Sequence, residues 1–499
     1  MRCYELTFTR FNRARQNSLY LTGVLLCSIF AVNACTTSPA TGGKVISFNT
    51  LAEEKRIGQR EHPKIVKQFG GEYNLPKVKN YVSDLGHKLA TISELPGIGW
   101  KFTVLNSREI NAFAIPGGFI YVTRGLLTLA SNEAELAGVI AHEIGHVTAL
   151  HSSTRQATGK MAGLGALAAG ILLGRAGSEL GSYIGRAGIQ QYSQSQELEA
   201  DSLGVRYLSR TGYDTRAMGS FLTKMRAFSK LENRRLGRPE DAMDRLSIFA
   251  SHPRTLKRIE RAIKTAARLK SGSRIGRVDY MAMLHGVVYG DDLEQGIIRG
   301  RDFIHPLLKF RFTVPEGFRL INNQNSVVAT NIEGSSIHFD MGPKTYNGPM
   351  ARYLKYVWAP KARLNDVESI MVNGMDGAGG GATIQRRGGV FNLRFVAVRN
   401  KNNKIFRLLF VTPRLKTRQL SSELRRTTFS LRTLSNREAS AITPATIRVK
   451  AVNADETIES IIQQMALTSF REQTFRILND LGPNENLRTG QLIKIVAKR

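Results

Sequence analysis

The stretch "VIAHEIGHVTALH", Val139–His151, contains three histidines and one glutamate among mostly apolar residues. His142 and His146 are four residues apart, so on a helix they lie on one face and can bind a single ion. Glu143 directly follows His142, where its carboxylate can take a proton from water bound to that ion. This HExxH spacing is typical of zinc peptidases and predicts one Zn²⁺ per chain.

A tetrahedral zinc site needs a third protein ligand, and the stretch "QELEADSLGVRYL" offers carboxylates for it. Glu197 and Asp201 are four residues apart on a predicted helix, so one can bind the metal while the other orients a ligand histidine. Glu199 is a competing ligand, although it points to a different side of that helix from Asp201. His151 does not fit the metzincin pattern, which needs its histidine one residue later.

The sequence also predicts where the HExxH helix begins and which other helices and strands the region contains. Asn132 and Glu135 form a capping-box pattern about ten residues before His142. The segments "WKFTVLNS" and "FIYVTRGLL" read as strands that flank "INAFAIPGG". Further on, "PRTLKRIERAIKTAARLK" predicts an amphipathic helix with leucines and isoleucines on one face and cations opposite.

Four segments, "NAFAIPGG", "ELAGVIAHEIGHVTALH", "ELEADSLG" and "SHPRTLKRI", occur in one order. Together they resemble the HExxH gluzincin zinc metallopeptidases of the HtpX, BepA and CAAX prenyl endopeptidase family, peptidase family M48, with the exported BepA-like branch nearest. The resemblance covers roughly residues 50–270. It implies that His142, His146 and Glu197 hold zinc, that Glu143 is the general base and that Asp201 supports a ligand.

The resemblance also implies a regulatory residue and a substrate strand. His252 of "SHP" corresponds to a histidine that can approach the zinc from a mobile loop as a fourth ligand; the alternative is a structural residue before the helix-starting Pro253. An extended substrate peptide is expected to pair with the strand of "NAFAIPGG", where the two glycines allow close approach. The residues of this substrate edge strand are Asn111, Ala112, Phe113, Ala114, Pro116, Gly117 and Gly118.

The beginning of the chain reads as an export signal. Four arginines within the first fifteen residues precede an apolar run that is too short to span a bilayer comfortably. Its end, "VNAC", resembles a bacterial lipobox, which predicts a signal peptide over residues 1–34 and lipidation of Cys35. The alternatives are cleavage by an ordinary signal peptidase and an uncleaved anchor. Cys35 would be the only cysteine of the mature chain, which excludes an internal disulfide. We therefore expect a periplasmic protein anchored to the outer membrane through Cys35.

The remaining sequence predicts a multidomain α+β protein. After a tether at residues 35–50, we expect a mainly helical zinc metallopeptidase domain with a small edge sheet at 51–272. An α+β accessory domain with an antiparallel sheet is expected at 278–436, where "GMDGAGGGA" reads as a hairpin tip. Residues 444–499 resemble a LysM module, a small βααβ unit that binds peptidoglycan, although Asp455-Glu456-Thr457 replaces its usual Gly-Asp-Thr.

The net charge of +31 would suit a nucleic-acid binder, but export favours anionic envelope partners instead. The alternative is a solvated basic surface with no dedicated ligand. The sequence therefore predicts an envelope endopeptidase whose substrates are unfolded or misassembled envelope proteins. Its predicted contacts are the membrane, through the lipid anchor, and peptidoglycan, through residues 444–499, with no nucleic acid. The alternative is a zinc-containing chaperone-like or cell-wall-binding scaffold with latent proteolysis.

Overall fold

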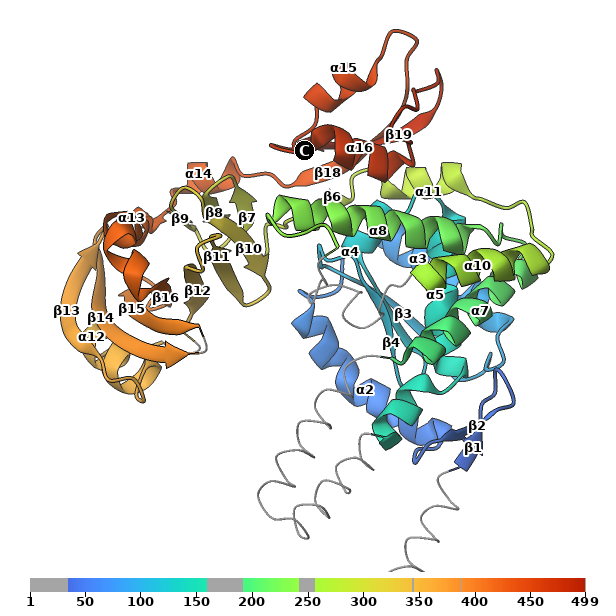
Figure 1. Cartoon of the computed structure of the whole chain (residues 1–499), viewed down its shortest axis with the longest axis horizontal. Coiled ribbons are helices and arrows are strands. Elements are labelled where there is room, and N and C mark those ends of the chain that lie inside the picture. Colours follow the sequence, from blue (N-terminus) through green and yellow to red (C-terminus); the bar gives the residue numbers. More distant parts are fainter. Residues whose placement is uncertain (1–34, 159–191, 242–255, 343–344, 387, 499) are drawn as a thin grey trace, which may run out of the picture.

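The computed structural model describes residues 35–158, 192–241, 256–342, 345–386 and 388–498 (Figure 1). The predicted signal peptide, an apolar segment at residues 161–174 and His252 lie outside these ranges. No helix within the described ranges combines the length and the apolar composition needed to cross a bilayer. The chain is multidomain and contains helices and several antiparallel sheets, as the sequence predicts.

The region before residue 290 is mainly helical and is built around α5 (Figure 1). Its helices are α2 (Leu51–Gln68), α3 (Pro76–Thr91), α4 (Arg124–Leu129), α5 (Glu133–Thr148), α7 (Gln194–Arg210), α8 (Ala217–Arg235), α10 (Leu256–Arg268) and α11 (Arg277–Leu284). Its sheet has the spatial order β3 (Lys101–Leu105), β5 (Phe119–Thr123) and β4 (Ala112–Ile115). Every residue of α5 is buried, because α3, α7, α8 and the sheet surround it.

The start of α5 has the predicted N-cap, but the capping box is incomplete because Glu135 accepts from Ser131 rather than from Asn132. The Asn132 side chain accepts a hydrogen bond from the Glu135 amide at 2.9 Å, and the Glu135 carboxylate accepts one from the Ser131 amide at 2.8 Å. These bonds satisfy amide groups that a helix start leaves open. The helix therefore begins at Glu133, and its second half carries His142 and its neighbours.

Residues 35–50, expected to be a tether, contain a hairpin of β1 (Cys35–Thr37) and β2 (Lys44–Ile46). The hairpin turn packs against the peptidase region, since the Ala40 amide donates to the Thr148 carbonyl at the end of α5, 3.2 Å away. Ser38 in this turn is 1% exposed. The segment that follows the predicted lipidation site is therefore attached to the end of the HExxH helix.

The accessory region has its own core of aromatic and branched residues beneath two sheets. The smaller sheet has the order β17 (Arg432–Thr433), β9 (Phe310–Thr313), β8 (Asp302–His305) and β7 (Ile297–Arg299). The larger has the order β10 (Arg319–Asn323), β11 (Ser326–Thr330), β12 (Ser336–Met341), β16 (Ile405–Pro413), β15 (Gly389–Arg399), β14 (Met375–Arg386) and β13 (Asn365–Val372). Its helical segments are α12 (Met350–Arg352), the π-helix η1 (Tyr353–Trp358), the 3₁₀ turn η2 (Arg414–Lys416), α13 (Thr417–Ser430) and α14 (Asn436–Ser440).

The glycine-rich run at 374–382 was predicted as a hairpin tip, and this prediction was wrong for most of the run. Only the turn around Gly374 fits it, because β14 begins at Met375 and pairs with β13 and β15 on its two sides. A Cβ on Gly377 would lie 2.8 Å from the Ala397 carbonyl oxygen, and one on Gly380 would lie 3.3 Å from Leu354 of η1. The glycines therefore allow neighbouring segments to pack closely on a strand.

The C-terminal unit has the predicted βααβ order, with β18 (Ala445–Ala451), α15 (Ile458–Gln463), α16 (Arg471–Asn479) and β19 (Leu492–Lys498). It is not separate from the peptidase region. β18 lies between β19 and β6 (Val288–Tyr289) in one sheet, and the apolar residues of the unit belong to the same core as those of α5. Figure 1 shows this unit lying against α8 and α11.

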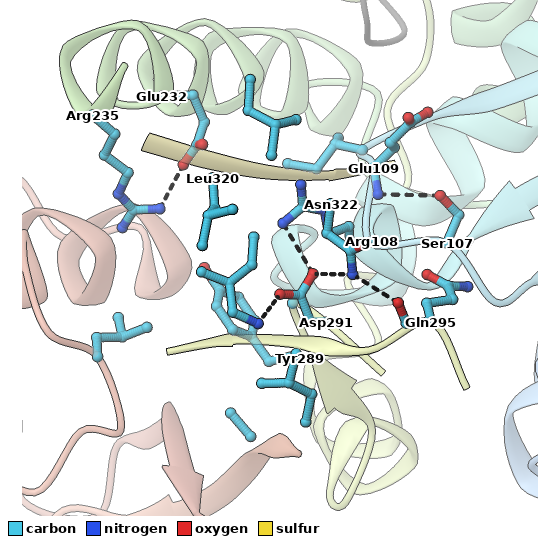
Figure 2. Close-up of a pocket in the computed structure, with 18 of the residues that line it drawn as sticks. Ser107, Arg108, Glu109, Glu232, Arg235, Tyr289, Asp291, Gln295, Leu320 and Asn322 are labelled. Carbon is cyan, nitrogen blue, oxygen red and sulfur yellow. Dashed lines mark hydrogen bonds and ion pairs between the residues drawn. The ribbon is translucent and has the colours of Figure 1, made fainter. Parts of the chain in front are cut away.

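The three regions meet around a cavity of about 850 Å³ (Figure 2). Asp291 joins two of them there, the peptidase region and the accessory region. Its carboxylate lies 3.0 Å from Arg108 of the peptidase region and accepts a 2.9 Å bond from the Ile298 amide of β7. The Asn322 amide of β10 donates to the Gly296 carbonyl at 2.9 Å beside it. This polar junction attaches the accessory sheets next to the loop that leads into β4.

Candidate metal centre

The candidate site forms where α5 and α7 approach each other most closely. A Cβ on Gly145 would lie 3.1 Å from the Leu203 side chain, and one on Gly204 would lie 3.1 Å from the His142 amide. Larger residues at these two positions would push the helices apart. The glycine inside "HEIGH" therefore brings the carboxylates of α7 within reach of the histidines of α5.

Three side chains converge at this contact. His142 Nε2 and His146 Nε2 lie 3.0 Å apart, and the two Glu197 oxygens lie 3.5 and 3.6 Å from those nitrogens. His146 and Glu197 are 0% exposed and His142 is 6% exposed. All three ligand atoms lie within 4.8 Å of one another. Of the two carboxylates that the sequence left in competition, Glu197 is therefore the one that joins the histidines.

This donor set fits zinc. Two imidazole nitrogens and one carboxylate are a ligand set used by catalytic zinc sites, which keep a fourth position open. The Nε2 atoms of His142 and His146 and the Glu197 oxygens point at one another, and a metal ion among them would accept their lone pairs. Within the described ranges, no other group of three such side chains meets the geometry of a metal site.

Asp201, which was predicted to orient a ligand histidine, lies beside His142. Its carboxylate is 2.9 Å from His142 Nδ1, the ring nitrogen that faces away from Glu197. A carboxylate at this nitrogen keeps the proton there and leaves Nε2 free to bind a metal. Burial disfavours the charge of Asp201, but Arg258 and the bond from His142 outweigh it and lower the pKa of this carboxyl.

Arg258 completes the centre, although its role was not predicted from the sequence. Its guanidinium forms 2.7–2.8 Å contacts with both oxygens of Asp201 and with Glu197. Burial alone would lower the pKa of Arg258, but the negative charges of Asp201, Glu197 and Glu143 raise it. The last of these effects indicates that the predicted general base, which is 0% exposed, shares the same buried charge cluster.

The role of Arg258 was not predicted because the buried face expected for α10 was wrong. Leu256 and Ile263, expected to face the core, are 56% and 55% exposed, whereas Arg258 is 3% exposed. The buried face instead carries Arg258, Ala262 and Ala266, four residues apart. The small alanines allow α10 to pack against α7 and α8. This spacing was the available signal in the sequence.

The other predicted site residues fall into two groups. Ala112, Phe113 and Ala114 lie on β4, which occupies one edge of its sheet and packs against α5. Gly117 and Gly118 have φ of 85° and 80° in the turn to β5, and a Cβ on Gly117 would lie 2.6 Å from the backbone of α2. These glycines are therefore needed for the turn and its packing. Asn111 and Pro116 flank the strand.

Comparisons with known proteins include a family match to the region that contains this site. Residues 76–266 match the family model described as Peptidase family M48. Over 193 residues the chain is 37% identical to a putative beta-barrel assembly-enhancing protease of Vibrio cholerae, covering 37% of this chain and 40% of that protein. Over 207 residues it is 32% identical to the beta-barrel assembly-enhancing protease of Escherichia coli K12, covering 39% and 42%. A mitochondrial metalloendopeptidase OMA1 of Schizosaccharomyces pombe is 28% identical over 217 residues, covering 42% and 60%.

An HExxH helix with a glutamate from a second helix defines a gluzincin-type metal centre. More particularly, residues 76–266 form a peptidase family M48 domain, and the predicted resemblance to beta-barrel assembly-enhancing proteases is confirmed. The matched stretch spans less than half of the two bacterial relatives. Since the family match ends at residue 266, the LysM resemblance of residues 444–499 stays a prediction.

Proposed function

We propose that this chain is a zinc metalloendopeptidase of the bacterial envelope that degrades misfolded or misassembled envelope proteins. The observation that carries the proposal is the buried convergence of Glu197 of α7 with His142 and His146 of the HExxH helix α5. The names of the bacterial relatives support a role in the assembly of envelope proteins.

In the proposed reaction, His142, His146 and Glu197 hold one zinc ion. When bound, zinc supplies Lewis acidity to the scissile carbonyl and to the attacking water. Glu143 accepts the proton of that water and later delivers it to the leaving amine. Asp201 fixes the ring of His142, and Arg258 keeps the carboxylates of Glu197 and Asp201 ionised.

The substrate is proposed to be an extended polypeptide that pairs with β4. This strand lies at the edge of its sheet and packs against the helix that carries Glu143. Backbone pairing accepts many sequences, because the hydrogen bonds come from main-chain groups. Such a mode suits an enzyme that cuts unfolded segments of different proteins.

The location is proposed to be the periplasmic face of the outer membrane, through lipidation of Cys35. The hairpin that follows Cys35 is bonded to the end of α5, so an acyl chain there would hold the active site close to the membrane. Labelling with a radioactive fatty acid tests the anchor. Native protein should carry label and Cys35→Ser should not, whereas unlabelled native protein would refute it.

The decisive experiment measures zinc content and casein degradation in the same preparations. We expect native protein to bind one zinc and to cut casein, Glu143→Gln to keep zinc while losing at least 100-fold in rate, and His146→Ala to lose both. Native protein that binds zinc without cutting casein would instead support the scaffold alternative. Full zinc occupancy in His146→Ala would refute the ligand assignment. Substrates trapped on Glu143→Gln in cells, identified by mass spectrometry, would name the natural targets.

A further inference from the structure

His151 and Glu199, both set aside as metal ligands, lie together behind His146. The Nδ1 atoms of His146 and His151 are 2.8 Å apart, and His151 Nε2 is 3.2 Å from Glu199 Oε2. The His151 side chain is 4% exposed, and that of Glu199 is 37% exposed. Thr41 in the N-terminal hairpin also forms a hydrogen bond with Glu199. A continuous set of contacts thus runs from the surface to the ring of His146.

The backbone is shaped to place His151 there. In an unbroken helix, a residue five positions after His146 would lie about 140° away around the axis. Instead α5 ends at Thr148, Leu150 adopts the left-handed conformation with φ of 58°, and a new helix runs from residue 151 to 158. This conformation is costly for a leucine, so surrounding contacts must hold it. The turn directs the imidazole of His151 back onto His146.

The geometry admits one arrangement of protons that satisfies all three groups with neutral rings. His146 Nε2 faces His142 and Glu197, so it must be unprotonated to bind a metal. Its proton then lies on Nδ1 and is donated to His151 Nδ1. His151 must in turn carry its proton on Nε2, where Glu199 accepts it. The chain of hydrogen bonds therefore begins at a carboxylate and ends at a ligand ring.

The two ligand histidines are thus supported in different ways. Asp201 contacts His142 Nδ1 directly, whereas His146 Nδ1 contacts a second imidazole, which in turn contacts Glu199. Tyr192 stacks on His146 with ring centroids 3.9 Å apart and holds the plane of the ring. Stacking does not choose which nitrogen carries the proton, so Tyr192 cannot replace His151 in this role.

We propose that His151 and Glu199 are positioning residues that set the tautomer and orientation of the metal ligand His146. The inference rests on the proposed zinc site and deepens it. Partners behind a metal-bound histidine typically contribute 10- to 100-fold to metal affinity. We therefore expect His151→Ala to weaken zinc binding about 10- to 100-fold. Glu199→Gln, which retains an oxygen that can accept the His151 proton, should fall between native protein and Glu199→Ala.

The experiment titrates full-length protein with zinc against a chromophoric chelator, and records the visible spectrum of the cobalt(II)-substituted form. A merely structural role would lower the thermal midpoint of the metal-free protein without changing zinc affinity or the cobalt spectrum. His87→Ala removes an exposed imidazole from α3 and serves as the matched control. Glu199 variants change a half-buried carboxylate, so they keep the test open if His151→Ala does not fold.

The outcomes separate the two proposals. Loss of zinc affinity in His146→Ala together with native affinity in both His151→Ala and Glu199→Ala would overturn this inference and leave the metal site intact. Native affinity in His146→Ala would overturn the metal site itself. Equal affinity for Glu199→Gln and Glu199→Ala, both weaker than native protein, would show that the charge of Glu199 matters rather than its acceptor oxygen, and would also contradict the proposed chain.

Discussion

Buried charged groups surround both ends of α5, but different kinds of partner satisfy them at each end. At the first turn, the Glu135 carboxylate lies 2.7 Å from Lys224 of α8, which also contacts Asp480 of the C-terminal unit. Lys494 of β19 donates to the carbonyls of residues 128–130 at 2.8–3.3 Å. Side chains and carbonyls of the chain itself satisfy this cluster, which we call the N-terminal cluster.

The second half of α5 is different, because its acceptor atoms converge on one point. His142, His146 and Glu197 bring their ligand atoms within 4.8 Å of one another, and a cation would relieve the crowding of their lone pairs. The two ends of α5 therefore have different roles. The N-terminal cluster should determine whether the chain folds, and the metal centre should determine what the folded chain does.

The largest effect should follow removal of residues 444–499. This deletion would expose the apolar core shared with α5 and leave Lys224 without Asp480. We expect loss of soluble protein and of cooperative melting, measured by circular dichroism. Arg448→Ala, an exposed change on β18, should leave both unchanged. A truncated chain that melts cooperatively and binds zinc would show that the C-terminal unit is an independent domain after all.

A single change in the N-terminal cluster should come next. Glu135→Ala leaves Lys224 buried beside one fewer acid, and breaking a buried ion pair costs about 3–5 kcal/mol. Denaturant unfolding measures the loss, with the exposed Glu260→Ala on α10 as a control that should change stability by less than about 0.5 kcal/mol. Adding Lys224→Met should restore part of the loss. Equal, additive losses in the double variant would mean that the two charges do not interact.

The same contrast shows what the sequence could predict. HExxH, its capping pattern and the "ELEAD" segment are local signals. They predicted the helices α5 and α7, and the structure brings His142, His146 and Glu197 of these helices together. The role of Arg258 was not predicted because it depends on which face of α10 packs against α7. The amphipathic pattern of α10 indicated the wrong face. The union of the C-terminal unit with the peptidase core was missed for a similar reason. It depends on a buried Lys494, and a lysine ordinarily predicts a surface.

Removal of the metal should destabilise the metal centre and leave the N-terminal cluster unchanged. Zinc that binds only the folded chain adds about 2.7 kcal/mol when its free concentration is 100 times Kd. Calorimetry should therefore show a lower melting temperature after chelation and recovery on adding zinc. Glu135→Ala, although less stable, should show the same zinc-dependent rise as native protein. His146→Ala should show none. A zinc response that disappears in Glu135→Ala would mean that the two clusters are coupled through the helix.

The smallest effect concerns Glu54 of α2, a buried acid that lacks the cation Glu135 has. Ser153 donates to its carboxylate, and no ion pair to it occurs among the described residues. Burial raises the pKa of Glu54 from 4.5 to about 7. Because the folded state then holds a proton that the unfolded chain releases, stability should fall as pH rises from about 4.5 through 7.

Glu54→Gln tests this reasoning. The raised pKa corresponds to about 3 kcal/mol at pH 8, and a buried amide N–H₂ without an acceptor offsets about 1 kcal/mol. The variant should therefore be about 2 kcal/mol more stable than native protein at pH 8 and slightly less stable at pH 4.5. Glu135→Gln should show no such gain at pH 8, because Lys224 already compensates that carboxylate. Denaturant unfolding across this pH range decides the point, and a Glu54→Gln curve parallel to native protein would mean that Glu54 is ionised at little cost.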